Sequence, residues 1–360
     1  MSRWRFGPIP PSCARCYANL WRRRNAMRTH SNNFDALRLA AALCVMVSHM
    51  FAVMGMAQPV VVAGHNLGNW AVLVFFSISG YLVAQSWESD PHVLRFLMRR
   101  WLRIWPALAV VVVLGMGVLI PVISGRGWIG LFSDPTYWKG FGILTLMANP
   151  GTIEPFATQA EKVWNGPLWT IPKEFACYVI LMGLGLMARK NLARYLPGLV
   201  LALAVFYMLG FGTAGSEVSS LRYVTSFVLC FLAGAMLALR SDWLERPMFW
   251  WAVALFAAAF IYEGMGTVAL MILTPSLAVA VGRMQWPVVS KVGAWGDFSY
   301  GTYLYGWPCQ QLAVMALGAG AGFAVLLGCS VILAMGCGVI SWYLIETPCL
   351  RLKPQRKIAA

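Results

Sequence analysis

Ten stretches of about 20 apolar residues constrain what this chain can fold into. A helix of that length crosses a bilayer with all its backbone hydrogen bonds made internally. Charged residues make up only 11% of the 360 residues, against roughly 25% in soluble domains. The sequence therefore predicts an all-α, polytopic integral membrane bundle of about ten transmembrane helices. The stretches are 34–55, 68–87, 102–124, 168–188, 194–212, 223–240, 248–262, 266–282, 299–318 and 321–344.

Basic residues predict the orientation of the bundle. Most of the 28 Lys and Arg residues lie in alternate connections, and the remaining connections hold only Arg126, Lys139, Lys162 and Arg222. Because cytoplasmic loops carry the excess of Lys and Arg, we expect a multi-pass protein with cytoplasmic N- and C-termini. The net charge of +15 is spread between apolar runs, which argues against a nucleic-acid partner.

The polar segments divide the chain further. Residues 1–33 contain seven arginines and predict a basic, disordered cytoplasmic tail before a transmembrane domain at 34–350, with a second basic tail at 351–360. The long loop at about 125–167 is expected outside, as an ordered cap or as an acceptor-binding surface. Met1 and Met27 are both candidate starts. Cys13 and Cys16 form a CxxC without a second pair, so we predict no metal site.

Two ionisable residues share one stripe of the first predicted helix. Arg38 and His49 are eleven residues apart, which is about 20° from full turns and a rise of about 16 Å. Asp35 lies on nearly the same face and can pair with Arg38. Ionisable groups inside a span are candidates for function. Snorkelling of Arg38 and an interhelical hydrogen bond from His49 are the alternatives.

Glu174 is a third ionisable residue at membrane depth. Its position six residues into an inward-running span predicts the same depth as His49. A carboxylate beside an imidazole would orient the ring and raise its basicity, as general-base catalysis requires. A buried structural pair, or an ion pair between Glu174 and the neighbouring Lys173, is the alternative.

A cluster of arginines and a small-residue segment complete the pattern. Arg99, Arg100 and Arg103 lie within five residues at the inner end of the third span, where guanidinium groups could bind phosphate or serve as ordinary topology charges. The segment FFSISGYL at 75–82 contains Ser79. Its small residues allow either close helix packing or a ligand against the backbone.

These pieces together resemble the integral-membrane acyltransferase family 3, whose members O-acylate bacterial cell-surface glycans. The resemblance covers most of residues 33–353 and rests on six motifs in order. They are Arg38 and His49 with ten residues between them, FFSISGYL at 75–82, Arg100 and Arg103 as RxxR, PLWTIPKEF at 167–175, SYGTYLYGWP at 299–308 and IETP at 345–348.

The resemblance implies an enzyme that moves an acyl group, usually acetyl, from cytoplasmic acyl-CoA to a hydroxyl of an exopolysaccharide, O-antigen or lipid-linked sugar. It implies His49 as the catalytic histidine, acting as general base or acyl relay, with Glu174 matching the family's acidic position. The family commonly has Tyr where this chain has Lys173, which leaves the role of Glu174 open. Acetyl-CoA would be a substrate, with no tightly bound cofactor. The resemblance also implies a multi-pass protein of the bacterial inner (cytoplasmic) membrane.

The residue pattern and the resemblance together assign further roles. Arg38, Arg100 and Arg103 would bind the CoA phosphates, and Tyr300 and Tyr303 would line the CoA path or pack in the core. Trp169 and Ser79 are candidate acceptor contacts, and Glu346 is expected to pair with an inner arginine. The rival functions are a multi-span transporter and a non-catalytic partner in polysaccharide export. The oligomeric state is not readable from the sequence.

Overall fold

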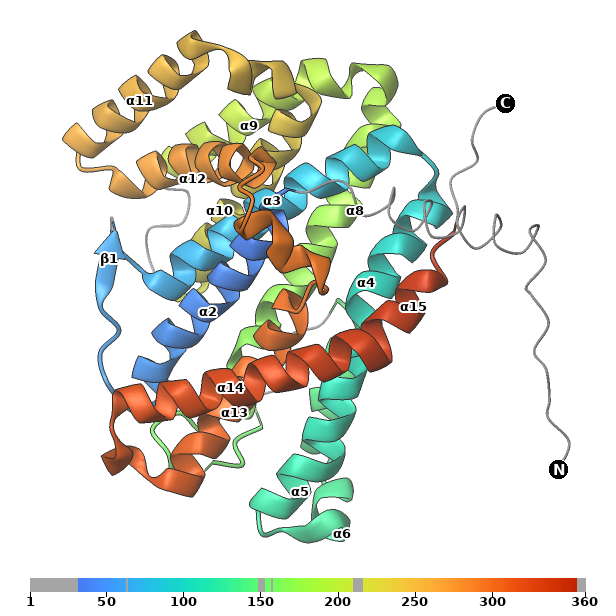
Figure 1. The fold of residues 1–360 in the computed structure, drawn as a ribbon, viewed down its shortest axis with the longest axis vertical. Coiled ribbons are helices and arrows are strands. Elements are labelled where there is room, and N and C mark those ends of the chain that lie inside the picture. The colour runs from blue at the N-terminus through green and yellow to red at the C-terminus, as the bar shows by residue number, and fades with distance from the viewer. Residues whose placement is uncertain (1–31, 63, 148–152, 157, 210–215, 355–360) are drawn as a thin grey trace, which may run out of the picture.

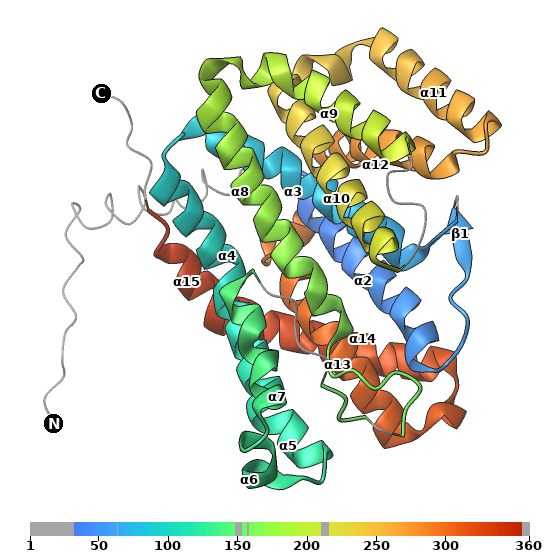
Figure 2. The same cartoon turned by 180° about the vertical axis from the view of Figure 1, so that it is seen from behind.

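A computed structural model describes residues 32–62, 64–147, 153–156, 158–209 and 216–354. Most of the first tail, with Cys13, Cys16 and Met27, and the last six residues of the chain lie outside the described residues. Within the described part the protein is an all-α bundle (Figures 1 and 2). The exception is a short antiparallel hairpin of β1 (Val60–Val62) and β2 (His65–Asn66).

Each of the ten predicted stretches overlaps a long helix. The ten are α2 (Phe34–Val53), α3 (Leu67–Ser89), α4 (Val93–Leu114), α8 (Thr170–Ala188), α9 (Leu192–Met208), α10 (Ser216–Leu239), α11 (Pro247–Tyr262), α12 (Gly266–Arg283), α13 (Ser299–Leu317) and α14 (Phe323–Ser341). The third helix begins nine residues before the predicted stretch, because its first turns carry the arginine cluster and are amphipathic rather than apolar.

Seven helical stretches among the described residues are long and apolar enough to cross a membrane, judged by length and composition. The stretch 166–208 holds both α8 and α9, and α11 is apolar but shorter. The set does not include α13, which buries polar side chains such as Gln310 and Gln311 in the interior of the bundle. Taken with the arrangement of the helices, these features show a polytopic membrane bundle.

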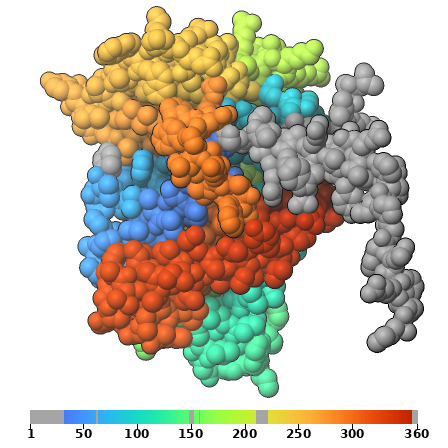
Figure 3. All heavy atoms as spheres, in the orientation of Figure 1, coloured from blue at the N-terminus to red at the C-terminus, as the bar shows by residue number. Residues whose placement is uncertain are grey.

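Short helices fill the remaining connections. The stretch after α4 continues through a π-helical turn (Gly115–Leu119) into α5 (Ile120–Ile123), followed by α6 (Gly127–Phe132) and α7 (Pro135–Trp138). 3-10 helices cover Lys139–Thr145, Gly166–Trp169, Arg189–Asn191, Ser241–Glu245, Val289–Ala294 and Ala319–Ala321. The chain closes with a π-helical turn (Trp342–Glu346) and α15 (Thr347–Arg351). In the space-filling view α14 and α15 form a band across the front (Figure 3).

The predicted outer loop is folded against α13 over its described residues. Gln311 donates to the Glu161 carbonyl (2.7 Å), and Trp307 donates to the Val163 carbonyl (2.9 Å). Asn165, fully buried, donates to the Leu304 carbonyl at 3.0 Å. This part of the loop is therefore held in place by α13, and its position outside the membrane and its role as a cap or an acceptor-binding surface stay predictions.

Close helix packing explains the FFSISGYL segment. A Cβ added at Gly80 would lie 1.9 Å from the Phe231 carbonyl oxygen, and one at Gly234 would lie 2.0 Å from the Ser77 carbonyl oxygen. The α3 and α10 backbones therefore touch, as small residues allow in membranes. The contact fixes α10 against α3, and α3 in turn packs against α2, the helix that carries Arg38 and His49.

Candidate active site

Asp297 joins two of the predicted phosphate-binding arginines. Its Oδ2 atom lies 2.7 Å from Arg38 Nη1 and also accepts a hydrogen bond from Arg103 Nη2. Its Oδ1 atom accepts from the backbone N–H of Ser299 at 3.2 Å. Burial raises the pKa of Asp297, but the two guanidinium groups outweigh it and hold that pKa below its ordinary value. The carboxylate thus ties α2, α4 and the start of α13 together.

Glu346 supplies the second carboxylate of this network. Its Oε2 atom lies 3.0 Å from Arg103 Nη1, and its Oε1 atom accepts from Ser341 Oγ at 3.1 Å. The predicted pairing of Glu346 with an inner arginine is confirmed. The predicted pairing of Asp35 with Arg38 is wrong, because the ion pair of Arg38 is with Asp297. Arg38 is therefore paired with Asp297, a loop residue 259 positions along the chain, and not with Asp35 on its own helix.

Arg100 differs from the arginines on either side. Arg99 pairs with Asp90 at 2.8 Å, whereas Arg100 pairs with no carboxylate of the described residues and donates only a long hydrogen bond to Ser86 Oγ at 3.5 Å. The Nε atom of Arg100 is buried without a hydrogen-bond partner. Of the three arginines predicted to bind phosphate, Arg100 is therefore the one whose charge is not neutralised within the described structure.

Lys353 adds a further cationic group at this end. It follows α15 and is partly buried. Burial, together with the charges of Arg100, Arg103, Arg99 and Arg38, lowers the pKa of Lys353 to about 7. We name this end of the bundle, with its four arginines and Lys353, the arginine end. A site with this excess of positive charge suits a polyanionic ligand.

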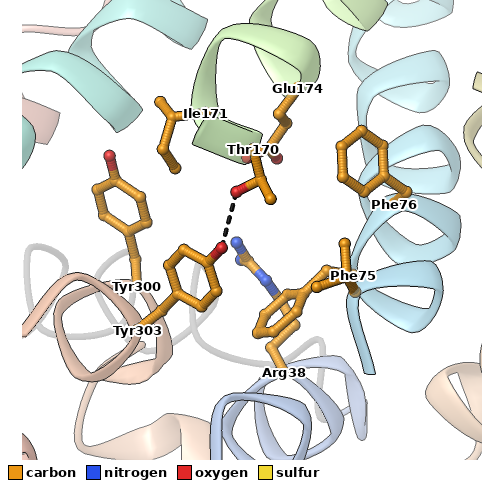
Figure 4. Close-up of a pocket in the computed structure, with 9 residues that line it drawn as sticks. Arg38, Phe75, Phe76, Thr170, Ile171, Glu174, Tyr300 and Tyr303 are labelled. Carbon is orange, nitrogen blue, oxygen red and sulfur yellow. Dashed lines mark hydrogen bonds between the residues drawn. The ribbon is translucent and has the colours of Figure 1, made fainter. Parts of the chain in front are cut away.

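A narrow cavity of about 40 Å³ begins beside Arg38 and is lined also by Glu174, Tyr300 and Tyr303 (Figure 4). We call it the inner cavity. In Figure 4 the Arg38 side chain reaches up between Tyr303 and Phe75 towards Thr170. The Tyr300 hydroxyl donates to the Ile104 carbonyl at 2.8 Å. The two tyrosines predicted to line the CoA path thus lie together, on one face of α13.

Glu174 lies in the inner cavity and not beside His49. Its Oε1 atom accepts hydrogen bonds from Ser79 Oγ at 2.8 Å and from the Tyr178 hydroxyl at 2.5 Å. The structure therefore does not form the predicted orienting pair of Glu174 and His49. It also places Ser79 in this hydrogen-bonded cluster, away from His49. Equal depth in the membrane does not fix the direction in which a helix turns its side chains.

His49 lies in a second cavity of about 130 Å³, which we call the histidine cavity. Its ring packs edge-on against Trp307, with centroids 5.0 Å apart. The imidazole makes no hydrogen bond to any described residue, so its nitrogens are available to a ligand. Ser48, Gln58 and Asn69 also line the cavity. Trp169, predicted to contact the acceptor, lies here as well.

The two cavities meet at a shared wall. Val72, Thr170 and Tyr303 line both. The Thr170 and Tyr303 hydroxyls are hydrogen-bonded at 2.7 Å, and Tyr303 also lies 3.0 Å from the Pro167 carbonyl oxygen. A single layer of side chains therefore separates the space beside His49 from the space beside Arg38.

Several residues of the two cavities and the arginine end were not predicted from the sequence. Asp297 stands directly before SYGTYLYGWP, and its position beside that motif is the signal that could have found it. The amides of Gln58, Asn66 and Asn69 fall just after the helix that carries His49. Two amides in so short a connection, with a third at the start of the next apolar stretch, were a second signal.

A family model described as an acyltransferase domain matches residues 31–343, most of the chain. The chain belongs to acyltransferase family 3. The match includes α2 to α13 and so contains both cavities. No solved structure matches this acyltransferase.

Two curated proteins resemble this acyltransferase over nearly their whole length. An O-acetyl transferase of Shigella phage Sf6 is 29% identical over 333 residues, which cover 88% of this chain and 95% of that protein. Nodulation protein 10 of Rhizobium leguminosarum bv. viciae is 27% identical over 356 residues, covering 90% and 94%. With the bundle of apolar helices, these similarities support a multi-pass membrane O-acyltransferase.

Proposed function

We propose that the protein transfers an acetyl group from cytoplasmic acetyl-CoA to a hydroxyl of an exopolysaccharide, O-antigen or lipid-linked sugar. The observation that carries the proposal is the pair of cavities. One is lined by Arg38, a member of the cationic arginine end, the other contains an imidazole with no hydrogen bond to a described residue, and one layer of side chains separates them. The similarity to the O-acetyl transferase of phage Sf6 supports acetyl as the group moved.

The donor would bind at the arginine end. Arg100 and Lys353 would contact the phosphates directly, because no described carboxylate neutralises Arg100, and because burial and the surrounding arginines lower the pKa of Lys353, which a bound phosphate would raise again. Arg38 and Arg103 would shape the site through Asp297 and contribute to its positive potential. In the cell this end would face the cytoplasm, where acyl-CoA is made, which agrees with the positive-inside rule.

The pantetheine arm would pass through the inner cavity. The helical rise of about 16 Å between Arg38 and His49 sets the distance it must bridge. Its path leads past Glu174 and Tyr300 to the wall of Val72, Thr170 and Tyr303. Rotation of the Tyr303 ring, with loss of its hydrogen bond to Thr170, would open this wall and let the thioester reach His49.

His49 would act as a general base from the histidine cavity. One of its ring nitrogens would take the proton of the acceptor hydroxyl while that oxygen attacks the thioester carbonyl carbon. The carbon–sulfur bond then breaks, and the proton on His49 passes to the leaving CoA thiolate. The acetyl ester and free CoA are the products. A neutral imidazole with an unoccupied nitrogen is the form this step requires.

Acetylation of cell-surface glycan tests the function. Cells that express the wild-type protein should add acetyl to their glycan, and cells that express His49→Ala should not. His92→Asn, at the start of α4, is the matched control and should behave like wild type, because asparagine can also cap a helix. Equal acetylation by His49→Ala would refute the assignment. Failure of the purified wild-type protein to bind acetyl-CoA would refute the donor.

A further inference from the structure

The lining of the histidine cavity is polar but uncharged at neutral pH. Twelve residues line it, and apart from His49 none has a side chain with a pKa near or below neutrality or a permanent charge. Besides the hydroxyls of the wall, the polar groups come from the end of α2, the connection after it and the start of α3, and are those of Ser48, Gln58, Asn66 and Asn69. This differs sharply from the arginine end, so the two cavities suit ligands of different chemistry.

Hydrogen bonds hold the amides of the histidine cavity in place and leave some of their donor and acceptor groups available to a ligand. Gln58 Oε1 accepts from Ser48 Oγ at 3.3 Å and from Asn66 Nδ2. Asn66 Oδ1 accepts from the Asn69 backbone N–H at 2.8 Å and so caps α3. The Gln58 NH₂ group and the whole Asn69 side-chain amide make no hydrogen bond to a described residue. An amide offers both donors and an acceptor, as adjacent sugar hydroxyls require.

Trp169 supplies an apolar surface beside these amides. It lines the same cavity, and 37% of it is exposed. Its ring packs against Phe227 with centroids 5.7 Å apart. An aromatic ring next to a few fixed polar groups is a common arrangement in ligand sites, and it matches a sugar ring, which has an apolar C–H face and a polar rim.

α2 and α3 approach each other closely at this cavity. A Cβ added at Gly68 would lie 2.9 Å from Ser48 Cβ and Oγ. The glycine lets the start of α3 pack against α2, so that Ser48, His49 and the amide of Asn69 line one space. The polar groups are therefore positioned by the packing of two long helices.

We propose that the histidine cavity binds one uncharged pyranose ring of the acceptor, with Gln58 and Asn69 hydrogen-bonded to hydroxyls next to the acetylated one and Trp169 against the ring's apolar face. The proposal rests on the proposed function and specifies its acceptor. A uronic acid or a phosphorylated sugar would bring an anion into a lining without a cationic partner, and burial of an unpaired charge is costly. Lys173, over the Trp169 ring, does not line the cavity.

An acceptor panel tests this specificity. The purified full-length protein in detergent would be given radiolabelled acetyl-CoA with methyl glucoside or methyl galactoside, and in parallel with methyl glucuronide or glucose 6-phosphate. We expect transfer to the neutral sugars at least tenfold faster than to the anionic ones. Binding of acetyl-CoA to the same sample is measured separately.

Variants locate the site. Gln58→Ala and Asn69→Ala should each raise KM for the neutral acceptor about three- to tenfold, as loss of one or two hydrogen bonds predicts, and leave KM for acetyl-CoA unchanged. Asn191→Ala, in the exposed turn before α9, is the matched control and should change neither. Asn69→Asp places a carboxylate in the cavity and should lower acetyl transfer to methyl glucuronide below the wild-type rate.

The outcomes separate this proposal from the proposed function. Equal or faster transfer to the anionic sugars overturns the proposal, as does an unchanged acceptor KM in both alanine variants. Bound acetyl-CoA with no transfer to a neutral sugar also overturns it and leaves the donor site intact. Absence of acetyl-CoA binding by the wild-type protein overturns the proposed function itself.

Discussion

Arg100 and Arg103 lie three residues apart, and we expect their removal to have opposite effects on stability. Arg103 contacts two carboxylates, Asp297 and Glu346, and is mostly buried. Arg103→Gln leaves Glu346 without its partner and Asp297 with Arg38 alone. Breaking a buried ion pair from one side costs about 3–5 kcal/mol. The variant should therefore unfold at a temperature several degrees below wild type.

Arg100→Gln should leave stability unchanged or raise it, because it removes a buried charge that no described carboxylate neutralises. It should instead weaken the binding of acetyl-CoA. Loss of a hydrogen bond to a charged group costs about 1.5–3 kcal/mol, which corresponds to a rise in Kd of about 10- to 150-fold.

Two measurements on each purified variant decide this contrast. Thermal unfolding is followed by tryptophan fluorescence, and acetyl-CoA binding is followed by isothermal titration at two salt concentrations, because phosphate contacts are screened by salt. An Arg100→Gln protein that loses stability but binds acetyl-CoA normally would refute the reasoning. So would an Arg103→Gln protein as stable as wild type.

Three further predictions follow from the same structure. Because the pKa of Lys353 is about 7 and a bound phosphate would raise it, acetyl-CoA affinity should fall as pH rises above 7, and Lys353→Gln should flatten that profile in titrations across pH. Gly80→Ala should lower Tm, since its Cβ meets the Phe231 carbonyl and overpacking costs about 1–3 kcal/mol; Gly183→Ala, with no atom nearby, is the matched control and should not. Tyr303→Phe loses its hydrogen bond to Thr170 and should raise the rate of acetyl-CoA hydrolysis in the absence of acceptor, measured as thiol release. An unchanged rate would show that this hydrogen bond does not separate the two cavities.

Much of the fold could be predicted because apolar length is a local property. The ten stretches each overlap a long helix, and the pairing of Glu346 with an arginine followed from the cost of an isolated buried charge. The closeness of Tyr300 and Tyr303 to one cavity also followed, because residues three apart share a helix face.

The partners across the bundle could not be predicted in the same way. Position along a helix gives depth in the membrane, and on that basis Glu174 and His49 were placed together. Their directions depend on how α2 and α8 rotate against α3, which is set by contacts such as Gly68 on Ser48 and Gly185 on Trp87. Asp297 stands between two helices and neutralises an arginine on a third, so no spacing rule connects it to Arg38.

The rate of acetyl transfer by purified His49→Ala tests the central claim most directly. General-base catalysis contributes about 10²- to 10⁴-fold, so the variant should lose at least a hundredfold in kcat and bind acetyl-CoA as tightly as wild type. Wild-type protein mixed with acetyl-CoA alone should form no acetyl-protein. Transfer by His49→Ala within about threefold of wild type would contradict the account, and so would an acetyl group trapped on His49.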